Sequence, residues 1–573
     1  MKIKKVLMVL TLMLTATMAV SCGGGAGSSS SSSKEKTDLT SSVITTYEAT
    51  DMSKNPETAK KRKDTLIIGT EAPDGVLNPL YAESMNDDYI TDTLYENLLN
   101  TTENGEVEDN LLESHSISDD GLTYTFKLKK DLTWSDGSKI TSKDIAFATK
   151  IVCDGTYTGP LDFVTGKTKI KGGRDYKEGK AEDISGIQVV DDETIKITLE
   201  EKSSSAIYDL GVFRPIPESY YGKYYKHGNT DGLKETYKKP GPVSGAYKLT
   251  SYKEGQEIDL EANSEYHKGT PKTKNLIYKV TEEDVQIPML QSGDIDMVSP
   301  TVSEDNVETI EGLGYMSYKL FPTNGYGYIA FNEAKPIFKD KAVRQALATG
   351  LDRAKIVNSV YGKYASVINV PQSKASWAYA DGDKDYAFDM DKAKKMLDDA
   401  GWKAGSDGIR EKDGQKLEIN FTGTTPNSVV DALLSVATDN WKELGIKFTS
   451  EKMDFNSMTA KQKTGNWDML FMAWVLTADP NDSPIYGTNG SQNKTSYSNS
   501  KIDEIYKKIA SESNKDKQKE LFKELYKELN EDLPYIYMYQ RNDMWAYNGR
   551  VKGLDVSPYV RYTYNLYKVS VED

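Results

Sequence analysis

Alternating apolar and polar residues predict β-strands in the first half of the chain. Residues 124–128 and 195–199 place apolar side chains at every second position, which is typical of a strand with one buried face. Residues 247–260 contain two such runs around Lys-Glu-Gly-Gln, a pattern that predicts a β-hairpin. Thr141 and Asp144 have the spacing of a capping box before an apolar run, so we expect a helix to begin there.

Helical periodicity dominates the second half. Apolar residues recur at intervals of three and four in residues 343–347, 393–400, 502–509 and 521–529, which predicts four amphipathic helices. We expect Ser500 to cap the third of them. Strand-type sequence returns at 535–539, where the chain is expected to rejoin the sheet of its first half. The patterns together predict a mixed α/β protein.

The N-terminus predicts export. Three lysines precede the uncharged apolar run of residues 6–20, so residues 1–21 have the pattern of a signal peptide, too short to span a bilayer comfortably. Small residues then lead to Cys22, which resembles the lipobox of bacterial lipoproteins, with Ala19 where leucine is usual. We expect lipidation of Cys22; the alternative is ordinary signal cleavage near Ser21 and a chance cysteine.

A polar segment follows the lipobox. Residues 23–33 are nearly all glycine and serine, and polar residues continue to about residue 64. Such a stretch buries too little apolar surface to fold, so we expect residues 22–64 to be a flexible, lipid-anchored linker.

Composition narrows the function classes. The 573 residues carry 72 Lys and Arg against 87 Asp and Glu, a net charge of -15 that argues against a nucleic-acid partner. Three histidines and two cysteines argue against a metal centre or metal cofactor built on these residues, and we expect Cys153 to be a buried apolar side chain. Substrate-binding protein, secreted enzyme and surface adhesin remain open.

Six blocks of sequence occur in one order along the chain after residue 64. They are Leu77-Asn78-Pro79 with 94–98; 120–128 with 134–137 and 141–145; 245–249 with Gly255 and 291–296; 331–332 with 340–353; 467–469 with 479–480; and 533–536. This ordered set resembles the extracytoplasmic solute-binding proteins of family 5, which serve oligopeptide and dipeptide ABC importers.

The resemblance implies a periplasmic-binding-protein-like α/β fold with two lobes and a ligand cleft between them. We expect lobe one at 65–320 with an inserted subdomain at about 96–183, lobe two at 321–535, and a return to lobe one at 536–573. The family implies a monomeric binding protein that is not an enzyme and has no cofactor.

The resemblance also implies a ligand site. An aspartate at the place of Asp479 pairs with the α-ammonium of a peptide; the alternatives are a structural Asp-Pro turn, or that Asp482 takes this role. Backbone groups of Ala473 and Val475 would pair with an extended peptide, and Trp474 would line a side-chain pocket or pack in the core.

Other candidate ligand-binding residues are more loosely matched. Tyr326 and Tyr328 are expected to face the cleft near the crossing into lobe two, and Ser84 and Met85 to form the opposite wall. Some relatives have an arginine for the peptide carboxylate where this chain has Phe471.

The function implied is capture of peptides and their delivery to an ABC permease that works with a separate cytoplasmic ATPase. A non-peptide solute, a signalling peptide, a surface hydrolase and an adhesin are the alternatives. Gly166-Lys167-Thr168 mimics the end of a phosphate-binding loop but lacks its first glycine, so it predicts no nucleotide site. We expect a location on the outer face of a bacterial membrane, on a Gram-positive surface rather than in a periplasm.

Overall fold

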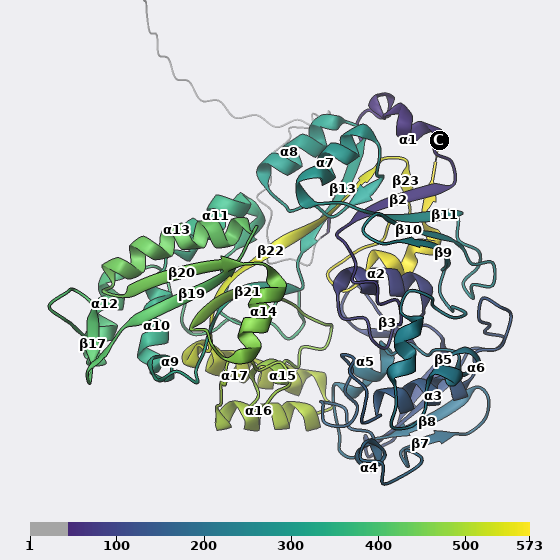
Figure 1. Cartoon of the computed structure of the whole chain (residues 1–573), viewed down its shortest axis with the longest axis horizontal. Coiled ribbons are helices and arrows are strands. Elements are labelled where there is room, and N and C mark those ends of the chain that lie inside the picture. The colour runs from purple at the N-terminus through teal and green to yellow at the C-terminus, as the bar shows by residue number, and fades with distance from the viewer. Residues whose placement is uncertain (1–43, 573) are drawn as a thin grey trace, which may run out of the picture. The chain divides into compact units, whose positions relative to one another are not determined.

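The computed structural model describes residues 44–572, and Figure 1 shows the course of the chain. The predicted signal peptide, Cys22 and most of the predicted linker lie outside the described residues. Among residues 44–572, no helix combines the length and the apolar character that crossing a membrane requires.

The structure corrects the predicted extent of the linker. Residues 44–64 contain β1 (Thr45–Tyr47), η1 (Met52–Lys54) and α1 (Glu57–Lys61) in place of flexible coil. β1 pairs antiparallel with β13 (Met316–Pro322), and the ring of Tyr47 stacks on Tyr318 with centroids 5.1 Å apart. A few apolar anchors therefore dock a segment whose overall composition is polar.

One sheet of thirteen strands runs through the body. Its main path, in order across the sheet, is β20 (Lys447–Met453), β19 (Glu418–Thr424), β21 (Met469–Val475), β14 (Gly325–Phe331), β22 (Tyr535–Asn548), β12 (Met297–Val298), β2 (Thr65–Thr70), β11 (Asn275–Val280), β10 (Glu257–Ala262) and β9 (Tyr247–Lys253). β1, β13 and β15 (Ala365–Ser366) join this sheet off the main path. The predicted hairpin of β9 and β10 is confirmed.

The first core is built from sequence-distant parts. Buried side chains between Leu66 and Tyr278 form one cluster with others between Trp545 and Val569. It includes a separate four-stranded sheet in the order β5 (Leu112–Ile117), β6 (Thr123–Leu128), β8 (Thr194–Thr198) and β7 (Ile187–Val189). The alternating strands predicted at 124–128 and 195–199 are confirmed. β7 and β8 belong to this sheet although they follow residue 183, the predicted end of the inserted subdomain.

Short helices and strands complete this part of the chain. They are α2 (Met85–Leu94), α3 (Ser142–Val152), α4 (Gly173–Lys177), α5 (Ala206–Gly211), α6 (Glu218–Tyr221), η2 (Gly222–Tyr224), η3 (Asp231–Thr236), η5 (Tyr562–Lys568), β3 (Leu99–Thr101), β4 (Val107–Asp109), β23 (Val551–Lys552) and β24 (Ser570–Val571). The capping box of α3 is confirmed, since the Thr141 N–H donates to Asp144 Oδ2 at 2.8 Å. Cys153, at the end of α3, is fully buried, as expected.

The second core lies between Tyr326 and Tyr539. Its helices are α9 (Pro336–Lys339), α10 (Lys341–Thr349), α11 (Arg353–Tyr361), α12 (Met390–Asp399), α13 (Ser428–Glu443), α14 (Phe455–Thr464), α15 (Ser483–Tyr486), α16 (Ser500–Ser511) and α17 (Lys515–Asp532). The four predicted helices are confirmed, with one correction. Asn499 caps α16 in place of Ser500, because its side chain accepts from the N–H groups of Lys501 and Ile502.

A smaller cluster lies beside the first core. It contains buried residues of α7 (Glu283–Ser292), α8 (Glu304–Leu313), β13 and the second half of β22. The remaining short elements are η4 (Gly362–Tyr364), β16 (Lys403–Ala404), β17 (Arg410–Lys412) and β18 (Gln415–Lys416).

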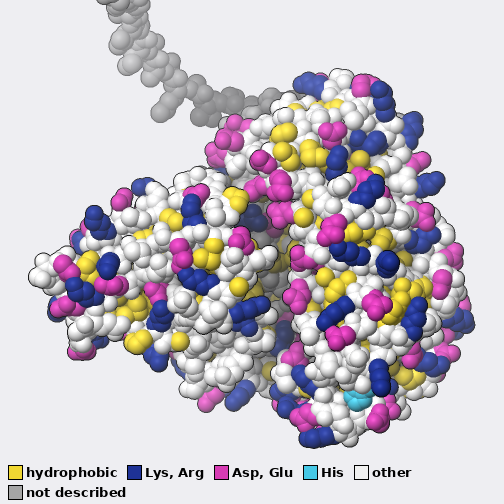
Figure 2. Space-filling view, in the orientation of Figure 1, with side chains coloured by type: hydrophobic (Ala, Val, Ile, Leu, Met, Phe, Trp, Pro, Cys, Tyr) yellow, Lys and Arg dark blue, Asp and Glu magenta, His cyan; other side chains and the backbone are white. Residues whose placement is uncertain are grey.

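β22 connects the two cores. Its first residues pair with β14 of the second core, and its residues from Asn542 onward pair with β13. The connection between β13 and β14 runs beside the middle of β22, so two segments of the chain cross from one core to the other. The space-filling view shows the surface hollowed between the side that carries β19, β20 and α14 and the side that carries α2, with acidic side chains along the rim (Figure 2).

Candidate functional site

The end of β21 has a free edge. The N–H of Leu476, just after the strand, donates to the carbonyl oxygen of Asn324 at 2.8 Å, so Leu476 faces β14. Because bonding directions alternate along a strand, Trp474 also bonds toward β14, and the backbone groups of Ala473 and Val475 face the other edge. There the register of β19 extends only to Leu470. Among the described strands, none covers the edge formed by Ala473 and Val475.

The side chains on this strand divide between its two faces. Those of Ala473 and Val475 are exposed, and Val475 is 64% exposed. Trp474 points to the opposite face, where its ring stacks on Tyr328 with centroids 6.0 Å apart and an angle of 6° between the ring planes. Trp474 is half-buried, so it packs against the second core and still presents part of its surface.

Tyr326 and Tyr328 lie inside the second core, each 2% exposed. The Tyr326 and Tyr486 hydroxyls are hydrogen-bonded at 2.7 Å, and Tyr328 stacks on Tyr535 with centroids 4.4 Å apart. Gly327 between them faces the Tyr539 ring so closely that a Cβ would lie 2.5 Å from it. The two tyrosines therefore pack in the core beneath β21 and do not line a surface.

Asp479 follows β21 and is 8% exposed. Its Oδ1 accepts the N–H of Asn481 at 3.1 Å, the local turn that an Asp-Pro sequence favours. Its Oδ2 lies 2.5 Å from Nζ of Lys167. The structural turn and a buried ion pair are therefore both present at this aspartate.

Lys167 belongs to the loop between α3 and α4, in the part of the chain that builds the first core. Its Nζ also lies 3.4 Å from the carbonyl oxygen of Asn481 and 3.7 Å from Asp209 Oδ1. Burial by itself lowers the pKa of a lysine, but the carboxylates of Asp479 and Asp209 raise the pKa of Lys167 above its ordinary value. Lys167 is therefore a stably charged ammonium.

Further polar contacts surround this ion pair. Thr168 Oγ1 donates to Asp209 Oδ2 at 2.7 Å and fixes that carboxylate beside the lysine. Asn481 Nδ2 donates to Ser205 Oγ at 3.1 Å, and the N–H of Ser204 donates to the carbonyl oxygen of Ala510 at 2.9 Å. The segment after β21 and the end of α16 are thus bonded to the loop and short helix that hold Lys167 and Asp209.

Asp482, the alternative to Asp479, lies deeper. It is 7% exposed, and its Oδ1 accepts the hydroxyl of Tyr506 at 2.6 Å. Burial raises the pKa of Asp482 to about 7, and the nearby charge of Asp479 adds to this effect. Its Oδ2 has no hydrogen-bond partner among the described residues.

Ser84 and Met85 lie at the start of α2. Ser84 caps the helix, because its Oγ accepts the N–H of Asp87 at 3.1 Å. Met85 is the first helical residue and is 36% exposed. α2 packs against β9 and η5, so these two residues belong to a different element from the β21 site, and their role as its opposite wall stays a prediction.

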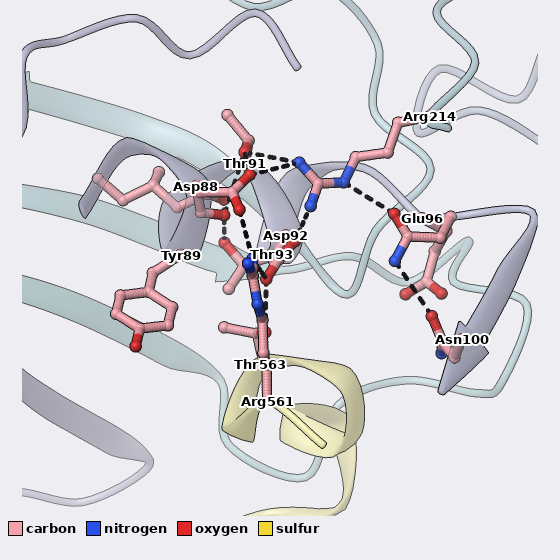
Figure 3. A network of polar contacts seen from close by, with 12 residues as sticks. Asp88, Tyr89, Thr91, Asp92, Thr93, Glu96, Asn100, Arg214, Arg561 and Thr563 are labelled. Atoms are coloured by element: carbon pink, nitrogen blue, oxygen red, sulfur yellow. Dashed lines mark hydrogen bonds and ion pairs between the residues drawn. The ribbon is translucent and has the colours of Figure 1, made fainter. Parts of the chain in front are cut away.

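A buried ionic network holds α2 in place (Figure 3). The Arg214 guanidinium donates to Asp88 Oδ1 at 2.9 Å and to Asp92 Oδ1, and Arg561 bonds the second oxygen of each carboxylate. Thr563 also donates to Asp92, at 2.9 Å. Both arginines oppose the effect of burial and hold the pKa of Asp88 below its ordinary value. α2 is thereby tied to the C-terminal segment.

The sequence did not single out Lys167 or Asp209 as site residues. In the sequence, Lys167 stands only in the motif that mimics the end of a phosphate-binding loop. Its partner Asp479 is 312 residues away, so no local spacing could indicate the pair. Among residues 44–572, no group of three or more His, Cys, Asp or Glu side chains has a geometry that would hold a metal ion.

Comparisons with known proteins agree on one family. Residues 106–496 match the family model described as bacterial extracellular solute-binding proteins, family 5, middle. The chain is 28% identical over 520 residues to the oligopeptide-binding protein AppA of Bacillus subtilis (strain 168), covering 88% of this chain and 91% of the relative.

Two solved structures are similar. One is the same Bacillus subtilis protein in complex with a nonapeptide, with a TM-score of 0.75, 27% identity, and coverage of 89% of this chain and 99% of the other. The other is lactococcal OppA with an endogenous peptide in the closed conformation, with a TM-score of 0.78, 21% identity, and coverage of 88% and 100%. The latter shows the fold alone. The predicted α/β fold with two lobes is confirmed.

The family model matches more than half of the chain. A family of solute-binding proteins also confirms the prediction that the chain is not an enzyme. The chain belongs to family 5 of the bacterial extracellular solute-binding proteins.

Proposed function

We propose that this protein captures peptides in the cleft between its lobes, with the free edge of β21 as the main binding element. The observation that carries the proposal is the edge at Ala473 and Val475, which no described strand covers. The relatives named as oligopeptide-binding proteins support the same choice of ligand.

The edge suits an extended peptide because main-chain groups are common to all peptides. Each of Ala473 and Val475 offers one N–H donor and one C=O acceptor toward the free side. A peptide lying along this edge adds a strand to the sheet, and its affinity comes from backbone hydrogen bonds rather than from particular side chains. Such a site accepts many sequences, which suits a nutrient importer.

Two further parts of the proposal rest on the N-terminal sequence and the family. Cys22 carries a lipid that anchors the protein to the outer face of a bacterial membrane, and residues 23–43 act as the tether. The closed, loaded protein then presents both lobes to an ABC permease driven by a separate cytoplasmic ATPase.

Mass spectrometry of the small molecules released by denaturing gently purified protein tests the ligand. A mixture of short peptides supports capture of nutrient peptides. One defined peptide would favour a signalling role, and a sugar or metal complex would overturn the peptide proposal while leaving the fold unchanged. For protein that is purified empty, calorimetric titration with random-sequence peptides decides: no heat of binding would contradict the proposal.

The anchor has a separate test. The wild-type protein should partition into the detergent phase of a cloud-point extraction of whole cells, and Cys22→Ser should move it to the aqueous phase or the medium. Equal partitioning of the two proteins would show that Cys22 carries no lipid. Uptake of labelled peptides by cells lacking this chain, compared with complemented cells, tests delivery to an importer.

A further inference from the structure

The carboxylate of Asp479 already has an ammonium partner from its own chain. The family resemblance places a ligand's terminal ammonium at this residue, yet Lys167 Nζ lies 2.5 Å from Oδ2. Asn481 supplies the second partner, through its N–H to Oδ1. Each oxygen of this carboxylate therefore has a donor, and the side chain is only 5% exposed.

A lysine ammonium and a peptide's terminal ammonium make the same interaction. Both are cations with three N–H donors, and both form charge-assisted hydrogen bonds with a carboxylate. Lys167 already fills the cation position at Asp479, 2.5 Å from Oδ2, and lies farther from Asp209, at 3.7 Å. A second ammonium at the same place would meet the positive charge of Lys167.

The lysine is held in position from both sides. Asp209 and Thr168 lie beside it in the part of the chain that builds the first core. The carbonyl oxygen of Asn481 accepts from Nζ on the side of the second core. The neighbouring bonds from Asn481 to Ser205 and from Ser204 to Ala510 join the same two parts. Contacts on both sides thus fix the position of the Lys167 ammonium, which a freely rotating surface lysine would lack.

We propose that Lys167 replaces the ligand's terminal ammonium at Asp479, and that this protein therefore binds peptides without requiring a free N-terminus. The inference rests on the proposed function. Its ligand class includes N-terminally blocked peptides and internal stretches of longer peptides, which lie along the free edge of β21 with their N-termini unanchored. Lys167 is then a specificity-determining residue: it removes the discrimination that an unpaired Asp479 would exert.

The test uses two pools of random-sequence peptides of equal length, one with free N-termini and one N-acetylated. The full chain is offered both pools together, and mass spectrometry measures the captured ratio. The wild-type protein should capture the two pools within about threefold of each other. Lys167→Met should favour the free-amine pool by about tenfold or more, because a ligand ammonium now supplies the missing charge.

Two control variants separate this effect from misfolding. Lys167→Arg keeps a cation beside Asp479 and should behave as the wild type does. Lys167→Met combined with Asp479→Asn removes both charges and should return the ratio to about one. The double variant also shows whether any new preference of Lys167→Met acts through Asp479.

Three results have distinct meanings. A wild-type preference of about tenfold or more for free amines would overturn the inference, since the ligand would then displace Lys167. An even ratio in Lys167→Met would overturn it as well. If the wild-type protein captures neither pool, the proposal of peptide capture fails first, and the inference fails with it.

Discussion

Gln540 donates a hydrogen bond from Nε2 to the carbonyl oxygen of Thr323 at 2.9 Å. These residues lie on the two segments that cross between the cores, so the crossings are bonded directly to each other. The N–H of Thr323 donates in turn to the carbonyl oxygen of Arg541, also at 2.9 Å. The two segments therefore form one hydrogen-bonded unit at the point where movement of the lobes is expected.

Gln540→Ala should destabilise the fold. The side chain is fully buried, also donates to Ser373 Oγ at 2.8 Å, and accepts the N–H of Lys374 at 3.0 Å. Alanine removes the partner of the half-buried Lys374 N–H and of the buried Thr323 carbonyl oxygen, so we expect the free energy of unfolding to fall by ~2 kcal/mol in urea denaturation. Gln415→Ala, at an exposed position of β18, is the control and should have little effect. An equal effect of the two substitutions would contradict this role for Gln540.

Arg214→Met should be more damaging. It leaves Asp88 and Asp92 with Arg561 as their remaining cationic partner, and the Asp92 side chain is only 1% exposed. Removing one partner of a buried ionic network typically costs about 3–5 kcal/mol, because a charge is left buried without compensation. Chemical denaturation measures the loss. The exposed Arg174→Met is the matched control; a loss under ~1 kcal/mol for Arg214→Met would show that Arg561 alone holds α2.

Asp482 should make stability depend on pH. Its pKa is about 7 in the folded protein against an ordinary value of 3.8, with burial as the main cause. Between these values the unfolded chain has lost its proton while the folded protein keeps it. Stability therefore falls as pH rises through this window, by ~1.4 kcal/mol per pH unit from this group alone. The charge of Lys167 lowers the pKa of Asp482 but does not cancel the increase caused by burial.

Asp482→Asn checks this contribution. The amide oxygen can still accept the Tyr506 hydroxyl, so packing is preserved. Compared with the wild type, the variant should gain stability at about pH 8 and lose the falling slope between about pH 4 and pH 7. Asp439→Asn, at an exposed position of α13, should keep the wild-type slope. Parallel pH profiles for the wild type and Asp482→Asn would assign the slope to other groups.

Val475→Pro should weaken peptide binding without unfolding the protein. Proline removes an N–H that points to the free edge and makes no bond to β14, so an edge position tolerates it. Loss of one backbone hydrogen bond should weaken affinity by up to about tenfold in calorimetric titration. Val475→Thr retains the N–H and should bind as the wild type does. Unchanged affinity in the proline variant would remove β21 from the proposed site.

Much of the fold could be predicted from local pattern. The alternation of β6 and the periodicity of α16 follow from which side chains must face a core, and a single sequence carries that information. The order of β14, β22 and β12 in the sheet could not be read in this way, because it depends on pairings between residues far apart in the chain. The structure of residues 44–64 was not predictable from composition, because β1 is held by pairing with β13 and by the stacking of Tyr47 on Tyr318, both far away in the sequence.

The candidate site also has a part that the sequence predicts and a part that it does not. The resemblance predicted that the backbone groups of Ala473 and Val475 pair with a peptide; these groups face an edge that no described strand covers, and the pairing itself stays a prediction. The surroundings of Asp479 were not predictable, since Lys167 reaches it through the packing of one part of the chain on another. Tyr326 and Tyr328 were expected to face the cleft, but both are buried. Tyr328 stacks on Trp474 and Tyr535, and Tyr326 is hydrogen-bonded to Tyr486 and packs edge-on against Tyr537.

The position of β22 has a consequence for biosynthesis. Its first residues, up to Tyr539, belong to the second core, but its later residues, among them Trp545 and Tyr547, complete the first core. The first lobe therefore contains both the earliest and the latest residues of the described chain to be synthesised. During synthesis, the apolar surface of the first core therefore stays incomplete until the residues from Tyr326 to Tyr539 have been made, and exposed apolar surface of this kind favours aggregation.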